Sequence, residues 1–200
     1  KIDEKSLPYF EEAYGNGIRT EQIHSASDYV YNASDLITLA GKKFSKKRNH
    51  INQFIKLYGE YEYSPICLNN LDECKRILDE WADRHETGCD PDNSERVACN
   101  ALFENWNRFP LKGALIKVNG TFQAFTIGEM LNPEMAAIRI EKGNVDIHGI
   151  YTLINREFCA NEWSHVKYIN REEDLGIEGL RKSKLSYNPA FMVNKFLVKV

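Results

Sequence analysis

Apolar and polar positions in this 200-residue chain switch between helical and strand-like spacing. Over residues 71–86, after the capping pair Asn69-Asn70, apolar residues recur every three or four positions, which predicts an amphipathic helix. A second helix is expected over Glu95–Phe109, and Gly88–Ser94 is expected to be the loop between them. The spacing therefore predicts a helical pair near the middle of the chain.

The pattern then changes to short runs of strand-forming residues. Asn119-Gly120 separates ALIKV from TFQAFTI, and Asn-Gly between two such runs predicts a type I′ hairpin. Residues 136–140 predict a third strand, residues 148–163 an amphipathic helix, and Phe191–Val200 a single terminal strand. The remaining predicted elements are strands at residues 29–31, 61–66 and 166–169 and a short helix at residues 178–185.

The segment Gly41–Lys56, GKKFSKKRNHINQFIK, carries six basic residues and no acidic ones. It is expected to be a helix whose apolar stripe, Phe44, Ile51, Ile55 and Tyr58, docks on the core. The whole chain has net charge −3, with 26 Lys plus Arg against 29 Asp plus Glu, so positive charge is concentrated here. Such a face suits a phosphate-bearing partner, and the alternative is a solvated helix face without a ligand.

Composition narrows the class of protein. The hydrophobic share of 42% is that of an ordinary globular domain, and no apolar run approaches the ~20 residues that cross a bilayer. Five cysteines without a C-x-x-C pair argue against a disulfide framework or zinc site, and the five scattered histidines argue against a bound metal. We expect a cytoplasmic protein whose basic helix can contact anionic lipid at a membrane surface.

The predicted order of elements is a mixed α+β arrangement, in which helices flank a mostly antiparallel central sheet. That order resembles the GNAT acyltransferase fold. Residues 34–200 are expected to form this domain, with residues 1–33 as an N-terminal extension. Because the chain does not begin with Met, we expect a fragment or a processed chain.

Two separated signatures carry a more specific resemblance. The first is the run YINREEDLGIEGLRKSKLSYNPAFMVNKF, which contains G-L-R-x-x-K followed by an aromatic residue and a proline. The second is Gly41-Lys42-Lys43 with Arg48 and Asn52. Together they resemble the C-terminal domain of phosphatidylglycerol lysyltransferases, and the first is also similar to Fem-type peptidyltransferases.

This resemblance implies transfer of an aminoacyl group from aminoacyl-tRNA to an amine or hydroxyl acceptor, such as a small amine or a lipid head group, without a further cofactor. It also implies that residues 1–33 are the end of a missing first GNAT-like domain. Two alternatives stay open: an acyl-CoA-dependent N-acyltransferase acting on a small amine, and a non-catalytic module that binds RNA or another anion.

Aminoacyl transfer needs a grip on the donor, a base for the acceptor and stabilisation of an oxyanion. Asp174 and Glu172, beside Arg171 at a strand end, are the expected catalytic residues, although acids there also complement a helix dipole. The expected substrate-binding residues are Lys42, Lys43, Lys46, Arg48, Asn52, Glu141, His148, Arg181, Lys184 and Tyr187. The alternatives are ion pairing for Arg181 and Lys184, capping for His148 and core packing for Tyr187.

The segment Lys142–Gly149 occupies the place where acyl-CoA-dependent relatives hold pyrophosphate on glycine-rich backbone amides. Its two glycines have the wrong spacing, and the charge of Asp146 repels phosphate. The sequence therefore favours aminoacyl-tRNA over acyl-CoA as the donor.

Overall fold

The computed structural model describes residues 1–85 and 94–199, so the loop expected at Gly88–Ser94 lies outside it except for its last residue. A seven-stranded sheet in the order β4-β5-β6-β7-β8-β3-β9 forms the centre of the molecule. Neighbouring strands pair antiparallel except β7 and β8, which are parallel. The strands are β3 (Asp28–Asn32), β4 (Tyr61–Pro65), β5 (Lys112–Val118), β6 (Thr121–Asn132), β7 (Met135–Gly143), β8 (Tyr168–Asn170) and β9 (Phe191–Val193). The predicted α+β class with a mostly antiparallel sheet is confirmed.

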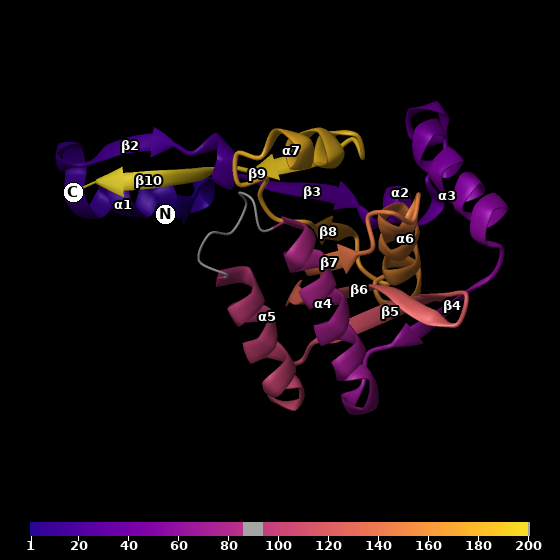
Figure 1. The fold of residues 1–200 in the computed structure, drawn as a ribbon. Coiled ribbons are helices and arrows are strands. Elements are labelled where there is room, and N and C mark those ends of the chain that lie inside the picture. The colour runs from indigo at the N-terminus through magenta and orange to yellow at the C-terminus, as the bar shows by residue number, and fades with distance from the viewer. Residues whose placement is uncertain (86–93, 200) are drawn as a thin grey trace.

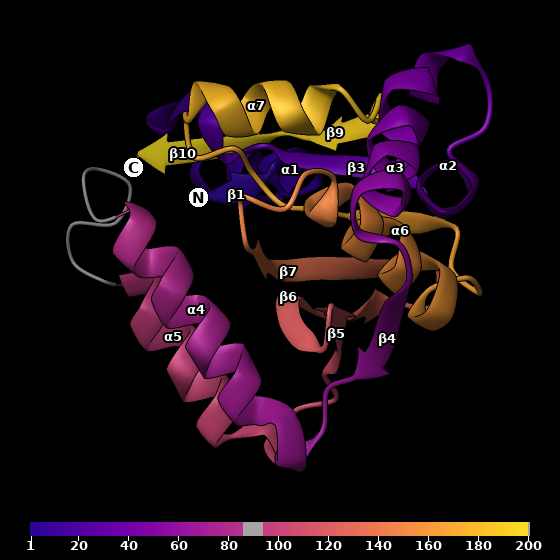
Figure 2. The ribbon, with the colours of Figure 1, turned by 45° about the vertical axis from the view of Figure 1, so that its right-hand side comes forward.

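Helices cover both faces of this sheet (Figures 1 and 2). The side chains of β5 alternate between two cores: Ala114 and Ile116 belong to one and Leu115 to the other. The first core is closed by α2 (Ala33–Thr38), α3 (Ser45–Tyr58) and α6 (Ile150–Glu162), and the second by α4 (Leu71–His85) and α5 (Ser94–Glu104). The helix α7 (Glu178–Leu185) is followed by Tyr187, which belongs to the first core.

A smaller sheet lies beside the main one and contains both ends of the described chain (Figure 1). Its strands lie in the order β1-β10-β2. Along the chain, the helix α1 (Leu7–Tyr14) connects β1 to β2. The strands are β1 (Ile2–Asp3), β2 (Arg19–Gln22) and β10 (Lys195–Lys199). Of the expected extension at residues 1–33, β1, α1 and β2 belong to this unit, whereas β3 lies inside the main sheet.

The prediction of one terminal strand at Phe191–Val200 is wrong. The chain leaves the main sheet after β9 and enters the small sheet as β10. Asn194 marks the change, because its side chain accepts a hydrogen bond from Gln22 (3.1 Å) and donates one to Glu4 (3.0 Å). Those partners lie more than 170 residues away, so no local pattern could indicate the break.

The strongest local predictions are confirmed. Asn119 and Gly120 have φ of 50° and 82°, as a type I′ turn requires, and they join β5 to β6. The helix α4 begins at Leu71 as expected, and the helix expected at residues 148–163 is α6. The helix expected at Glu95–Phe109 ends at Glu104 instead. Short 3₁₀ segments lie at Glu4–Ser6, Gly15–Gly17, His24–Ala26, Lys42–Phe44, Leu68–Asn70 and Trp106–Arg108.

The basic segment forms α3, but its buried stripe differs from the predicted one. Ile55 is 47% exposed, whereas Phe54 and Lys47 are buried. The helix is therefore rotated so that one lysine points toward the protein interior. None of the helices within residues 1–85 and 94–199 is long and apolar enough to cross a membrane.

Candidate functional site

The candidate site lies where the parallel strands β7 and β8 separate. They pair only from Met135↔Tyr168 to Ala137↔Asn170, and the next amide, that of Arg171, donates to Tyr29 on β3 instead (2.9 Å). Beyond this point the Arg171 guanidinium spans the gap and pairs with Glu141 near the end of β7, at 2.9 Å. Both side chains are 12% exposed, so the ion pair is almost withdrawn from water.

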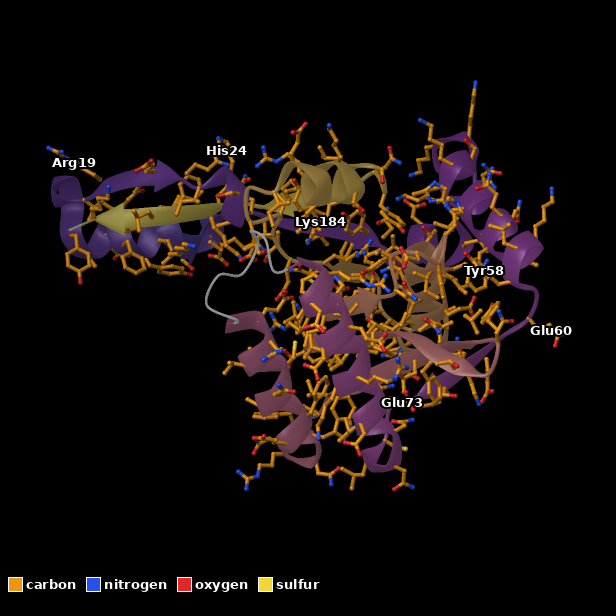
Figure 3. The ribbon with its side chains drawn as sticks, in the orientation of Figure 1. Arg19, His24, Tyr58, Glu60, Glu73 and Lys184 are labelled. Atoms are coloured by element: carbon orange, nitrogen blue, oxygen red, sulfur yellow. The ribbon has the colours of Figure 1, made fainter. Side chains whose placement is uncertain are left out.

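Two lysines join Arg171 in this place. Lys47 reaches in from α3, and its Nζ lies 3.6 Å from the centre of the Tyr187 ring, which the Arg171 guanidinium also approaches, at 4.8 Å. Lys184 points inward from α7 (Figure 3) and donates to the carbonyl oxygens of Arg171 and Glu172. We call Lys47, Arg171, Lys184 and Tyr187 the cationic cluster.

Burial shapes the charge of the cluster. It lowers the pKa of Lys47 to about 8, with the Arg171 charge adding to the effect. The pKa of Lys184 is lowered to about 8 for the same two reasons. Burial also opposes the charge of Arg171, but the Glu141 carboxylate outweighs it and keeps the guanidinium pKa above its ordinary value. The cluster is therefore rich in positive charge at neutral pH, and it holds donors ready for an anion.

Neighbouring polar groups fix the geometry. The Tyr31 hydroxyl donates to the Lys184 carbonyl (2.9 Å), and the Tyr31 ring meets that of Tyr187 edge-on, with centroids 6.3 Å apart. Asn155 on α6 donates from Nδ2 to Glu141 Oε2 (3.0 Å). Residues of β3, α6 and α7, which are far apart in sequence, thus surround the Arg171–Glu141 pair.

Of the predicted site residues, the structure brings together Glu141, Arg171, Lys184 and Tyr187. Lys47 and Asn155 are not among the predicted site residues; they lie inside the basic segment and the helix expected at residues 148–163. A signal for Lys47 existed: Phe44, Lys47, Ile51 and Phe54 recur at three- and four-residue spacing, so Lys47 interrupts an otherwise apolar stripe.

Asp174 lies outside the cluster and its environment argues against a role as general base. It is 1% exposed and receives hydrogen bonds from Tyr29 (2.7 Å), from the Gly176 amide (2.8 Å) and from Arg181 Nε (2.8 Å) and Nη2 (3.1 Å). The Arg181 contact above all holds the pKa of this carboxyl well below its usual range. Arg181 is thus the ion-pair partner of Asp174, the alternative that the sequence left open.

Glu172 fits a base better than Asp174. Burial raises the pKa of its carboxyl, although Arg139 donates to it and opposes the shift. Its φ of 56° lies in the left-handed region, which is uncommon for a residue with a Cβ. Glu172 therefore sits in a constrained turn directly after Arg171, next to the cluster.

The predicted donor-binding residues of the basic segment lie on the outside of α3 and in the turn before it. Arg48 donates to the carbonyl oxygens of Leu39 and Gly41, so it caps the end of α2. Lys43 pairs with Asp35 at 3.0 Å. The remaining predicted residues are exposed, and their side chains make no hydrogen bond or ion pair within residues 1–85 and 94–199: Lys42, Lys46 and Asn52.

His148 is exposed and its ring lies edge-on to that of His50, with centroids 5.2 Å apart. It belongs to the segment Lys142–Gly149, whose backbone amides are largely used within the protein. The donors and acceptors are Gly143 to Tyr151 Oη, Asn144 to Gln123 O, Asp146 to Asn144 Oδ1, Ile147 to Asn144 O and His148 to Tyr58 Oη. A pyrophosphate could bind these amides only by breaking those bonds. Among the described residues, no three His, Cys, Asp or Glu side chains gather as a metal site.

Comparison with known proteins gives a consistent family. A profile of the family described as "Phosphatidylglycerol lysyltransferase, C-terminal" matches residues 1–199. The uncharacterised protein MYCGA3080 of Mycoplasmoides gallisepticum is 29% identical over 186 residues, which are 90% of this chain and 58% of that protein. A solved protein of unknown function from Bacteroides thetaiotaomicron is 38% identical, with a TM-score of 0.92 over 98% of this chain and 67% of that one.

More distant structures share the fold. L-PGS from Bacillus licheniformis is 16% identical, with a TM-score of 0.69 over 98% of this chain and 65% of that one. A tandem GNAT protein from the clavulanic acid biosynthesis pathway is 11% identical, with a TM-score of 0.53 over 100% of this chain and 59% of that one. The fold is therefore GNAT-like, and this chain spans 58% to 67% of the proteins named here.

Proposed function

Because the chain belongs to the phosphatidylglycerol lysyltransferase C-terminal family, we propose that it transfers an aminoacyl group from aminoacyl-tRNA to an amine or hydroxyl acceptor. The family and the GNAT-like fold support an acyl- or aminoacyltransferase-like role. The choice of aminoacyl-tRNA as donor rests on the site described above.

The cationic cluster is the observation that carries this proposal. Attack of the acceptor on the donor ester forms a tetrahedral intermediate with a negatively charged oxygen. Lys47 and Lys184 are buried and the Arg171 side chain is only 12% exposed, so these cations are largely withdrawn from water. Fixed positive charge there stabilises a developing anion far better than in bulk solvent. The Tyr187 ring holds two of these cations through its face.

The atoms of the step balance without a further cofactor. A bond forms between the acceptor nitrogen or oxygen and the ester carbonyl carbon, and the bond from that carbon to the ribose oxygen breaks. The acceptor proton passes to a base, for which Glu172 is our candidate, and returns to the ribose oxygen as it leaves. The products are an amide or ester and uncharged tRNA.

Two features favour tRNA over acyl-CoA as the donor. Lys42 and Lys46 are exposed on the basic segment, whereas Lys47 of the same segment points toward Tyr187 in the protein interior. Phosphates bound by the exposed lysines would therefore lie near the cationic cluster. The segment Lys142–Gly149 has most of its amides engaged, and Asp146 pairs with Arg84 at 2.6 Å. A CoA pyrophosphate would therefore find most of these amides engaged and the Asp146 carboxylate beside them.

The proposal is tested with a mixture of tRNAs charged with labelled amino acids, offered with small amines and with phospholipid vesicles. Wild-type protein should form a labelled product, and Lys184→Met should reduce the rate by about a hundredfold, the size of effect seen when an oxyanion donor is lost. Lys182→Met, two residues away on α7 and 74% exposed at its side chain, is the matched control and should keep full activity.

Lys47→Met provides a second variant if Lys184→Met fails to fold. Absence of transfer from every charged tRNA by folded wild-type protein would contradict the proposal. RNA binding without turnover would instead support the non-catalytic module.

A further inference from the structure

Asp28 and Asn170 are buried polar residues that the proposed reaction does not use. Asp28, the first residue of β3, is 8% exposed, and Asn170, the last residue of β8, is 5% exposed. Asn170 Nδ2 donates to Asp28 Oδ2 at 3.1 Å. Because a carboxylate only accepts, this bond fixes the orientation of the Asn170 amide and turns its Oδ1 away from Asp28.

The Asn170 oxygen holds the turn that contains Glu172. Asn170 Oδ1 accepts from the Glu172 amide at 2.7 Å, and an asparagine that accepts from the amide two residues later stabilises a turn. The Glu172 carbonyl oxygen accepts from the Tyr29 amide at 3.1 Å. The φ of Glu172, 56°, is uncommon for a residue with a Cβ, and bonds on both sides of the residue stabilise it.

The other end of this series of bonds lies in the small sheet. Lys195 is the first residue of β10, and its carbonyl oxygen accepts from the Ile23 amide at 2.9 Å. Its side chain reaches back to the main sheet, where Nζ donates to Asp28 Oδ1 and lies 3.6 Å from Glu173 Oε2. The Lys195 charge thus compensates a carboxylate that would be costly to bury alone. A continuous relay of hydrogen bonds therefore runs from β10 to the Glu172 turn.

We propose that Lys195, Asp28 and Asn170 are positioning residues, which hold Glu172 beside the cationic cluster and make the site depend on β10. This inference rests on the proposed function, in which Glu172 is the base, and adds control of that base by a strand outside the main sheet. Arg139 donates to the Glu172 carboxylate, so the relay acts on the backbone of the turn and Arg139 on the side chain. Loss of the relay should leave donor binding intact and slow the chemical step.

An interchange of the two buried polar residues tests the relay. In Asp28→Asn, an amide that accepts from Lys195 turns its own donor toward the Asn170 donor, so the bonds cannot all form. In Asn170→Asp, two carboxylates face each other and repel. The double variant Asp28→Asn/Asn170→Asp restores every donor–acceptor pair with the same total charge. It should therefore recover what each single variant loses.

Each single variant should lower kcat about tenfold to a hundredfold, the effect of a misplaced catalytic group. KM for charged tRNA should stay within about twofold, because the basic segment is not touched. The acid limb of kcat against pH should move to lower pH, since burial raises the pKa of the Glu172 carboxyl and a loosened turn exposes it. The charged groups around it, Arg139, Glu173 and Lys184, are unchanged. A purely structural relay would lower the amount of folded protein without moving this limb.

Hydrogen exchange of the Glu172 amide, measured by NMR, follows the turn without any substrate. It should be faster in each single variant and in Lys195→Met, and it should return to the wild-type rate in the double variant. Lys199→Met, on the same strand and 64% exposed at its side chain, is the matched control and should change neither exchange nor kcat. The Lys195 side chain is 27% exposed, so Lys195→Met tests the relay even if the buried single variants fail to fold.

The outcomes separate the two proposals. Wild-type amide exchange and kcat in Lys195→Met and in the folded single variants would overturn the relay and leave the transferase function standing. Faster exchange with an unchanged kcat and acid limb would overturn the positioning role in the same way. No transfer from any charged tRNA by folded wild-type protein would overturn the transferase function, and the positioning role with it.

Discussion

Folding buries the charge of Lys47, and this burial lowers the stability of the folded state. Its side chain is buried, it has no carboxylate within ion-pair distance in residues 1–85 and 94–199, and burial lowers its pKa from 10.5 to about 8. The Tyr187 ring face compensates only part of this cost. A residue that opposes stability in this way is expected where function requires the charge.

The pH dependence of Lys47→Met tests this account. Below pH 8 both the folded and the unfolded lysine are protonated, so the folded state bears the full cost of the buried charge. Between pH 8 and 10.5 only the unfolded lysine binds the proton, so wild-type stability rises with pH. Lys47→Met should therefore be more stable than wild type at pH 7, and the difference in free energy of unfolding should shrink by pH 10.

Urea denaturation at several pH values measures that difference. Lys56→Met, an exposed position on the same helix, is the control and should change the free energy of unfolding by less than about 0.5 kcal/mol. If the difference in free energy of unfolding between Lys47→Met and wild type did not change with pH, the buried charge of Lys47 would not destabilise the folded state.

Asp174 makes the opposite contribution. Because Arg181 and Tyr29 bind its charged form, its pKa is lowered, and the resulting stability is present above the unfolded value of about 3.8 and lost as the pH falls below it. Asp174→Asn should cost about 2 kcal/mol at pH 7, as expected for hydrogen bonds to a buried charge. The deficit should narrow below pH 4, where wild type loses the same interaction.

Thermal melts of Asp174→Asn at pH 7 and pH 3 provide the measurement. Glu178→Gln, whose pair with Lys182 is on the surface, should stay within about 0.5 kcal/mol of wild type at both values. A stable Asp174→Asn protein that has lost transfer would return Asp174 to the list of catalytic candidates.

At the scale of elements, the sequence correctly predicted the helices and turns whose signals lie within a few neighbouring residues. The start of helix α4 and the Asn119-Gly120 hairpin were predicted correctly because their signals are complete within a few residues. The orientation of α3 was not, since its spacing allows either Lys47 with Phe54 or Arg48 with Ile55 to be buried. Partners distant in sequence, above all Tyr187, select the first arrangement.

On α3, we expect Arg48 to contribute to stability and Lys46 to contribute to donor binding. Arg48→Ala removes the donor that caps the Leu39 and Gly41 carbonyls, so it should cost about 1–2 kcal/mol in free energy of unfolding. Lys46→Ala removes an exposed side chain and should change stability by less than about 0.5 kcal/mol. Chemical denaturation of the two variants gives the comparison, and equal stability would show that the Arg48 contacts contribute little.

Lys46→Ala should instead weaken donor binding. If Lys46 contacts a phosphate of the tRNA, its removal should raise KM for charged tRNA and reduce the slope of log affinity against log salt by about 1. Lys75→Ala, on α4 at the other face of the sheet, is the control and should leave the slope unchanged. A slope unaffected by Lys46→Ala would place the tRNA elsewhere.

At the scale of the whole molecule, the site depends on segments that only the complete fold brings together. Lys47, Glu141, Arg171 and Lys184 come from α3, β7, the turn after β8 and α7, across nearly 140 residues of sequence. The sequence named three of these four, because each lay at the end of an element or within a family signature. It could not show that they meet, since the separation of β7 from β8 follows from pairing with β3.

The same arrangement predicts which donor stabilises the folded chain. A ligand that binds only the folded state at 100 times its Kd stabilises it by about 2.7 kcal/mol. Charged tRNA should therefore raise the melting temperature, followed by fluorescence of the buried Trp106 and Trp163. Millimolar CoA should leave it unchanged, because most amides of Lys142–Gly149 are already bonded. Uncharged tRNA should give a smaller shift, since it reaches the outer lysines but lacks the aminoacyl group for the cluster. Stabilisation by CoA and none by tRNA would favour the acyl-CoA-dependent alternative and require those amides to rearrange.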